Sequence, residues 1–156
     1  IITLSWVSPV SSAPPLVMLA VSPKRYSHGL IDASAEVTVN VPPWSTLEET
    51  YFCGTTSGRD VDKFSECAFT PLTSRCIRTP GIAECIVTLE CVVRDRFAAG
   101  DHTLFIAEVL AITADEDVVD DVFGAGGGEV RTIHHLGGNL FAPLGGPARR
   151  AGRDIG

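Results

Sequence analysis

Hydrophobic and polar positions along the chain predict a mostly β protein. Residues 1–7 have the apolar, β-branched composition of a strand, and a second apolar run covers residues 16–21. The stretch SPVSSAPP at 8–15 predicts a loop, because proline cannot donate a hydrogen bond to a central β-ladder. The stretch EVTVNV at 36–41 alternates apolar and polar side chains with the period of a half-buried strand.

Two longer apolar runs predict one extended hairpin. They cover residues 82–94 and 102–113, and the short stretch FAAGD at 97–101 connects them. A further strand is expected at 129–133, followed by a turn in LGGN at 136–139. Long paired strands with little helix favour a barrel.

Helix signals are short and lie between these strands. The stretch SPKRYSHGLI begins like a helix, with Ser22 as N-cap and Pro23 at the first helical position. The sequence STLE from Ser45 has the spacing of a capping box and predicts a helix that stops at Gly54. A second short helix is expected to start near Asp60.

Composition narrows the class of protein. A chain of 156 residues that is 45% hydrophobic is enough for one domain with a real core, which we place at residues 1–144. The Gly- and Arg-rich residues 145–156 predict a flexible tail. The net charge of −7 argues against a nucleic-acid surface, which needs a basic footprint.

Neither a signal peptide nor an apolar run near the ~20 residues of a membrane helix is visible, so we expect a cytoplasmic protein without a membrane partner. The five cysteines form no CxxC pair or zinc-finger spacing, which predicts neither a metal site nor a disulfide framework. Residues 115–121 hold five acids, which favours a solvated loop over a docking patch for a partner protein.

Two stretches carry candidate anion chemistry. In the sequence YFCGTTSGRDVDKF at 51–64, a small polar run exposes backbone amides just before Arg59 and Lys63. This stretch fits an anion-binding cradle, and it fits equally a helix end followed by a turn. The turn at 24–28 gathers Lys24, Arg25, Ser27 and His28. Because cations are unfavourable at a helix N-terminus, an anionic ligand is a simpler explanation for this turn than a solvated loop.

For the remaining candidate side chains, a ligand-binding role and a structural role are both considered. Asp101 and His102 open the second strand of the long hairpin, where the histidine can either face a ligand or cap the turn. Trp6 can stack on a planar ligand or fill the core, and the core is the commoner role. Adjacent His134 and His135 point to opposite faces of a strand, which is poor geometry for one metal ion.

The motifs together resemble a known family. The order SWVSPVSSAPP, SPKRYSHGLI, VTVNVP, YFCGTTSGRDVDKF, LEC, GDHTLFIAEV and HLGGN is similar to that of the flavin reductase-like, FMN-binding split-barrel proteins, in particular their flavoredoxin-like branch. The resemblance extends over residues 1–141.

The resemblance implies a mainly β fold, namely a six-stranded antiparallel split barrel with short flanking helices. It also implies a homodimer with noncovalent FMN near the dimer interface. Relatives have a strand before the SWVSP segment, so we expect the N-terminal strand to be truncated here. The residues carried over as FMN contacts are Ser5, Trp6, Lys24, Arg25, Ser27, Arg59, Lys63 and His102.

The implied function is an oxidoreductase that passes electrons from NAD(P)H through bound FMN to free flavin or to a protein partner. A cation beside the pyrimidine edge of the flavin would stabilise the reduced form. One alternative is an FMN-binding electron carrier without NAD(P)H activity of its own. Another is a split barrel that has lost flavin and serves only as a dimerising scaffold.

Overall fold

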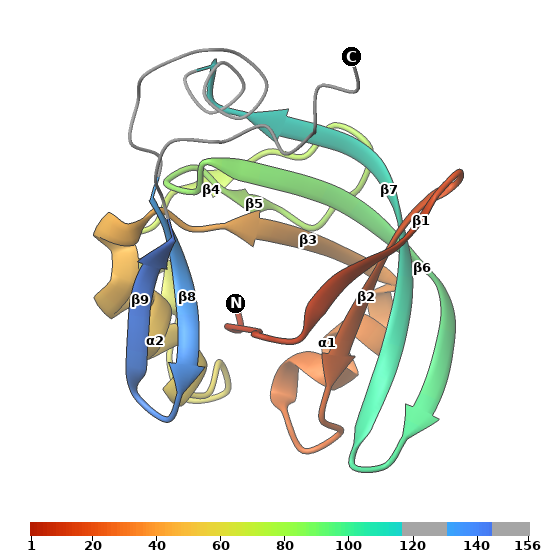
Figure 1. Cartoon of the computed structure of the whole chain (residues 1–156), viewed down its shortest axis with the longest axis horizontal. Helices are drawn as coiled ribbons and strands as arrows, with labels where there is room; N and C mark the ends of the chain where they lie inside the picture. Colours follow the sequence, from red (N-terminus) through yellow and green to blue (C-terminus); the bar gives the residue numbers. More distant parts are fainter. Residues whose placement is uncertain (117–130, 145–156) are drawn as a thin grey trace, which may run out of the picture.

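The computed structural model describes residues 1–116 and 131–144, and a five-stranded antiparallel sheet forms its centre (Figure 1). The strand order is β1-β2-β7-β6-β3. These strands are β1 (Val7–Ser12), β2 (Pro15–Val21), β3 (Glu36–Val41), β6 (Val87–Ala99) and β7 (His102–Ala114).

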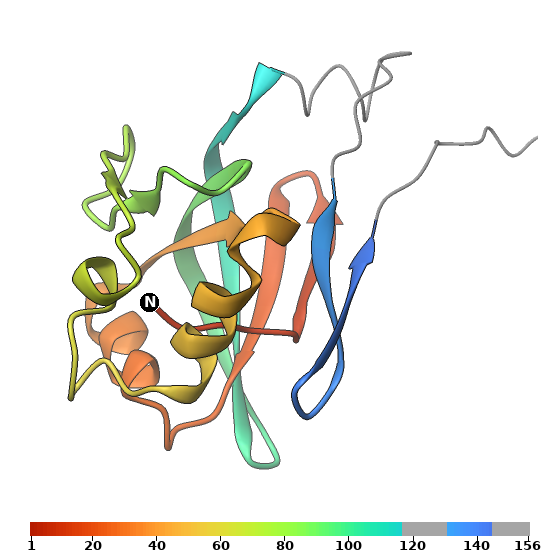
Figure 2. The same cartoon turned by 90° about the vertical axis from the view of Figure 1, so that its left-hand side faces the viewer.

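Short helices and two small hairpins surround this sheet. The helices are α1 (Tyr26–Ser34), the 3-10 turn η1 (Trp44–Thr46), α2 (Leu47–Thr55) and α3 (Lys63–Glu66). The hairpins are β4 (Pro71–Leu72) with β5 (Gly81–Ile82), and β8 (Thr132–Gly137) with β9 (Leu140–Leu144). Figure 2 shows the first residues of the chain running between the main sheet and α2.

The core lies on one face of the main sheet, where alternate residues of the central strands point inward. Phe105 and Ala107 of β7 and Cys91 of β6 have no exposed surface, and Val21 of β2 has almost none. Ile31 of α1 closes the cluster. This alternation confirms the period-two pattern in the sequence and the mainly β, antiparallel architecture with short helices.

The predicted boundaries of the first strand and loop were wrong. Residues 1–6 form no strand, and β1 covers Pro9 inside the stretch predicted to be a loop. Within the described part of the chain, β1 is an edge strand that pairs with β2 alone, so its proline does not remove a hydrogen bond from a central ladder. The pairing register also shifts between Pro9 and Ser11.

Helix α1 starts later than predicted. The N–H of Arg25 donates to the carbonyl of Ser22 at 2.9 Å, which closes a turn, and the helix begins only at Tyr26. Lys24 and Arg25 therefore stand in the turn before the helix and not in its first turn.

The capping signals for α2 were also misleading. Its N-cap is Thr46, and no side chain caps it. The helix ends at Thr55, one residue later than predicted, so Gly54 is its last residue but one. A Cβ at Gly54 would lie 3.2 Å from the Cβ of Thr3. The glycine lets the N-terminal segment approach α2 closely. The short helix α3 begins slightly later than Asp60, with Asp62 accepting a hydrogen bond from the N–H of Phe64 at its start.

The long hairpin is confirmed, with β6 paired to β7 around a turn at Gly100. Strand β8 begins at Thr132, and the turn predicted in LGGN joins it to β9. The acidic stretch beyond residue 116 and the predicted tail at 145–156 lie outside the described residues. None of the described helices is long and apolar enough to cross a membrane.

Candidate functional site

Two hollows flank the start of α1, and the residues predicted to contact a cofactor divide between them. The first hollow has a volume of about 500 Å³, and the second has a volume of about 250 Å³. The first is lined by Ser27, Arg59 and Lys63 together with Tyr26 and Ile1. The second is lined by Ser5, Trp6, Arg25 and His102 together with His135. Lys24 lines neither of them.

In the second hollow an aromatic side chain is held at the surface. Trp6 is 61% exposed, and its ring lies 4.8 Å from the ring of His102, centroid to centroid. Nδ1 of His102 lies 2.7 Å from Oδ1 of Asp101, so it must donate to that carboxylate. This hydrogen bond, followed by the charges of His102 and Lys24, lowers the pKa of Asp101. His102 is therefore bonded to its neighbour in the hairpin turn and also lines the second hollow.

The turn before α1 supplies cationic groups at the surface. Lys24 and Arg25 are exposed, and neither cationic head makes a hydrogen bond or ion pair with another of the described residues. Ser27 is half-buried at the start of the helix. His28 instead points inward, with Nε2 2.8 Å from Oγ1 of Thr103 on β7. The structure therefore directs three of the four polar side chains of this turn toward the surface.

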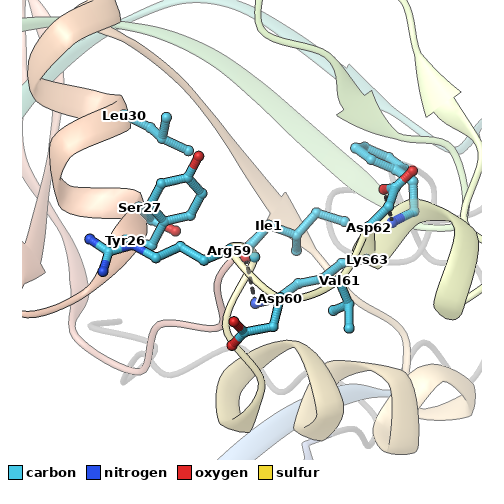
Figure 3. Close-up of a pocket in the computed structure, with 11 residues that line it drawn as sticks. Ile1, Tyr26, Ser27, Leu30, Arg59, Asp60, Val61, Asp62 and Lys63 are labelled. Atoms are coloured by element: carbon cyan, nitrogen blue, oxygen red, sulfur yellow. Dashed lines mark hydrogen bonds between the residues drawn. The ribbon is translucent and has the colours of Figure 1, made fainter.

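Figure 3 shows the first hollow, which Arg59 crosses toward α1. The guanidinium carbon of Arg59 lies 5.2 Å from the ring centroid of Tyr26, within range of a cation–π contact. Because the carboxylates of Asp60 and Asp62 also belong to this lining, the first hollow has mixed charge. Among the residues that the structure describes, none with an acidic side chain lines the second hollow.

Lys63 has a different environment from the other predicted contacts. It is only 5% exposed, and its Nζ donates to the carbonyl oxygens of Cys53 at 2.6 Å and Ile1 at 2.8 Å. Burial lowers the pKa of Lys63, and the charge of Arg25 lowers it further. The fold thus uses much of the hydrogen-bonding capacity of this ammonium group to join the N-terminal segment to α2.

Two lining residues were absent from the predicted contacts. Nδ1 of His135 on β8 forms a hydrogen bond of 2.9 Å with Oγ of Ser5. Nε2 of the same ring donates a hydrogen bond of 3.0 Å to the carbonyl oxygen of Gly138. Because a carbonyl oxygen can only accept, Nε2 of His135 carries a proton. The sequence placed His135 on one face of a strand but gave no signal that this face meets Ser5.

Tyr26 is the second such residue, and its position next to the cationic turn was the available signal. Within residues 1–116 and 131–144, His, Cys, Asp and Glu side chains form no group of three or more that could hold a metal ion.

Comparisons with known proteins agree on one family. A model of the flavin reductase like domain matches residues 1–134. A protein of Archaeoglobus fulgidus is 37% identical over 113 residues, which is 72% of this chain but 64% of the relative. The chain thus spans slightly less than two thirds of that relative's length.

Two solved structures place the fold among flavin proteins. The flavoredoxin of Desulfovibrio vulgaris (Miyazaki F) superposes with a TM-score of 0.83 at 20% identity, covering 97% of this chain and 81% of that one. An NADH:FAD oxidoreductase of Streptomyces globisporus reaches a TM-score of 0.64 at 26% identity, covering 70% of this chain and 64% of that one. The split-barrel fold expected from the sequence is confirmed by these matches.

Proposed function

The chain belongs to the flavin reductase-like domain family, and we propose that it binds FMN noncovalently and passes electrons from NAD(P)H through the flavin to an acceptor. The acceptor would be free flavin or a partner protein. The observation that carries this proposal is the exposed cationic turn beside the exposed ring of Trp6.

The turn fits a phosphate group. Lys24 and Arg25 present two charges that no described residue neutralises by an ion pair, in a chain whose net charge is −7. Ser27 adds a hydroxyl beside them. A terminal phosphate is a dianion that accepts charge-assisted hydrogen bonds from such groups, so we assign the phosphate of FMN to this turn.

The second hollow fits a planar ring system. Trp6 and His102 offer stacking surfaces, and Ser5 and His135 add polar atoms to the same lining. Arg59 is the further candidate cation, and it would reach the ligand from the first hollow. When bound, the flavin supplies hydride and electron chemistry, while these residues bind and orient it.

Reconstitution tests the proposal directly. Purified protein is mixed with excess FMN, desalted and examined by visible absorbance. We expect the flavin spectrum to stay with the protein fraction. A folded protein that emerges colourless would exclude FMN binding in this chain, and retention of FAD but not FMN would contradict the phosphate assignment.

Arg25→Ala tests the position of the phosphate. Loss of one charged phosphate contact costs about 1.5–3 kcal/mol, so we expect FMN affinity to fall roughly 10- to 100-fold in fluorescence titrations. Riboflavin, which lacks the phosphate, should bind the variant and the wild type alike. Arg78→Ala removes the same charge from a side chain that is 90% exposed and lines neither hollow, and its FMN affinity should not change.

A non-catalytic electron carrier is the second candidate, and the likeness to a flavoredoxin favours it. The likeness to an NADH:FAD oxidoreductase favours the enzyme. Stopped-flow mixing of the FMN-loaded protein with NADH or NADPH separates the two. Rapid bleaching of the bound flavin supports the enzyme, and no bleaching over minutes supports the carrier.

A further inference from the structure

Two thiols lie in contact outside both hollows, and the proposed flavin chemistry does not use them. Cys53 is 2% exposed within α2, and Cys67 is partly exposed at the C-terminal cap of α3. Their Sγ atoms are 3.7 Å apart, although 14 positions separate the two residues in the chain. The fold therefore brings together two cysteines that the sequence spacing does not pair.

Hydrogen bonds between α2 and α3 hold the backbone around the two cysteines. The carbonyl oxygen of Cys53 accepts the 2.6 Å hydrogen bond from Nζ of Lys63, the residue that opens α3. The N–H of Cys67 donates to the carbonyl of Lys63 at 3.2 Å, and its Sγ lies 3.9 Å from the carbonyl of Glu49 on α2. Both thiols are thus held by the same contact between α2 and α3.

We propose that Cys53 and Cys67 are an oxidation site at which a hydroperoxide converts the two thiols into a reversible disulfide. A disulfide has a sulfur–sulfur bond of about 2.0 Å, so the two sulfur atoms need to approach by about 1.7 Å. Rotation of the partly exposed Cys67 side chain can supply much of this movement. Cys67 is the C-cap of α3, a helix of only one turn, so few backbone hydrogen bonds oppose a small shift there.

The order of the steps follows from burial. Burial, followed by the hydrogen bond with Cys67, raises the pKa of the Cys53 thiol to about 11, so this thiol stays protonated at neutral pH. Cys67 reaches solvent, and its sulfur attacks the hydroperoxide ROOH. The O–O bond breaks, ROH leaves with the thiol proton, and Cys67 becomes a sulfenic acid.

The second step closes the disulfide. The sulfur of Cys53 attacks the sulfur of Cys67, the S–O bond breaks, and the hydroxide takes the Cys53 proton and leaves as water. Overall the two thiols lose two electrons and two protons, and the hydroperoxide is reduced to ROH and water. The nearby charge of Lys63 offsets part of the effect of burial on the pKa of Cys53 and so assists the loss of its proton during the attack.

The bond would change the segment between the two helices. It would join α2 to α3 across the loop that carries Arg59, which lines the first hollow. Cross-linking a loop of this length stabilises a protein mainly by restricting its unfolded state. We expect the oxidised protein to melt on the order of 5 °C above the reduced one.

Peptide mapping of the full-length protein tests the proposal. The protein is treated with hydrogen peroxide, free thiols are blocked, and the denatured chain is digested with trypsin. Cys53 and Cys67 then fall on separate peptides, 26–59 and 64–75, while Cys76 falls on 76–78. We expect peptide 26–59 to be linked to peptide 64–75, and dithiothreitol to separate the two peptides again. The intact oxidised protein should remain a monomer whose mass is lower than that of the reduced protein by two hydrogen atoms.

Cysteine variants identify the partners. Cys67→Ser should abolish the link, whereas Cys76→Ser removes an exposed thiol and should leave the link unchanged. A link from 26–59 to 79–94, which holds Cys85 and Cys91, would overturn the assignment. Free thiols at both positions in peroxide-treated, folded wild type would overturn the proposal without any variant.

Discussion

Lys63 carries its ammonium group into the interior of the fold, where two backbone carbonyls accept its hydrogen bonds. The sequence placed it in a candidate anion cradle after a small polar run and Arg59, and the family resemblance carried it over as an FMN contact. Its burial depends on the N-terminal segment folding over α2, and nothing in the local sequence reports such a long-range contact. The candidate site keeps Lys63 in its lining, but the structural role of this residue is the one that the contacts support.

Lys63→Met tests that role at the scale of one residue. Methionine fills a similar space but leaves the carbonyls of Ile1 and Cys53 without their donor, so we expect a loss of about 1–3 kcal/mol in the free energy of unfolding. Urea denaturation measures the loss. Lys24→Met removes an exposed lysine from the turn and should change stability by less than about 0.5 kcal/mol. Equal effects of the two substitutions would contradict the structural role.

The other predicted contacts came partly from residue types and partly from the family resemblance. Trp6, Arg25 and His102 line one hollow. The cationic turn marked Arg25, whereas the local sequence favoured a structural role for Trp6 and left His102 undecided, so only the resemblance assigned these two to the cofactor. Their grouping in space could not be read from the sequence, since it requires the turn before α1 to meet the start of β7. His135 was missed because its partner, Ser5, lies 130 positions away.

At the scale of elements, close backbone approaches decide where helices and strands meet. Gly81 of β5 is the tightest such position. A Cβ at Gly81 would lie 2.8 Å from Cγ2 of Thr88 on β6, and Thr88 is 4% exposed and donates to Oδ1 of Asn40 at 2.9 Å. The threonine therefore cannot move aside without breaking a buried hydrogen bond.

Gly81→Ala should destabilise the protein by about 1–3 kcal/mol, the usual cost of overpacking a filled core, as measured by urea denaturation. Thr88→Ser keeps the hydroxyl and removes Cγ2, so the glycine substitution should cost at least about 0.5 kcal/mol less in that background. Gly29→Ala in α1 meets no atom within 4 Å and should stabilise by about 0.5–1 kcal/mol. If Gly81→Ala costs as much stability in the Thr88→Ser background as in the wild type, a clash with Cγ2 of Thr88 is not the cause of the loss.

Elements with a strong hydrophobic period were predicted well, and those punctuated by proline or glycine were not. The β6–β7 hairpin and β3 follow from alternation over several residues. Pro9 signalled a loop, but an edge strand accommodates it. Gly54 signalled a helix end, but its small size serves packing against Thr3. In both cases tertiary position overrode a local rule.

At the scale of the whole molecule, the fold raises the pKa values of three thiols, of which Cys53 and Cys91 are buried and Cys85 is partly exposed. Burial raises the pKa of Cys53 to about 11 and the pKa values of Cys85 and Cys91 to about 12, from an ordinary value of 9.0. A group whose pKa is raised by folding contributes its stability below the unfolded pKa and loses it as the pH rises through the folded pKa.

The free energy of unfolding should therefore fall as the pH rises from 9 to 12, in urea titrations with a reductant present. Lys63 opposes this trend below pH 10.5, since its lowered pKa makes stability rise there, but one amine is outweighed by three thiols. Cys91→Ala should flatten the alkaline loss, even though it lowers stability at neutral pH. An unchanged slope in this variant would show that Cys91 ionises as freely in the folded protein as in the unfolded one.

The N-terminal segment has a consequence for how the two hollows relate. Ile1 lines the first hollow and Ile2 to Trp6 line the second, so one extended stretch forms a wall of each. A ligand that displaces this wall on one side changes the space on the other side. If a ligand displaces this wall, occupancy of the two hollows becomes thermodynamically linked, and each ligand then changes the binding free energy of the other by the same amount.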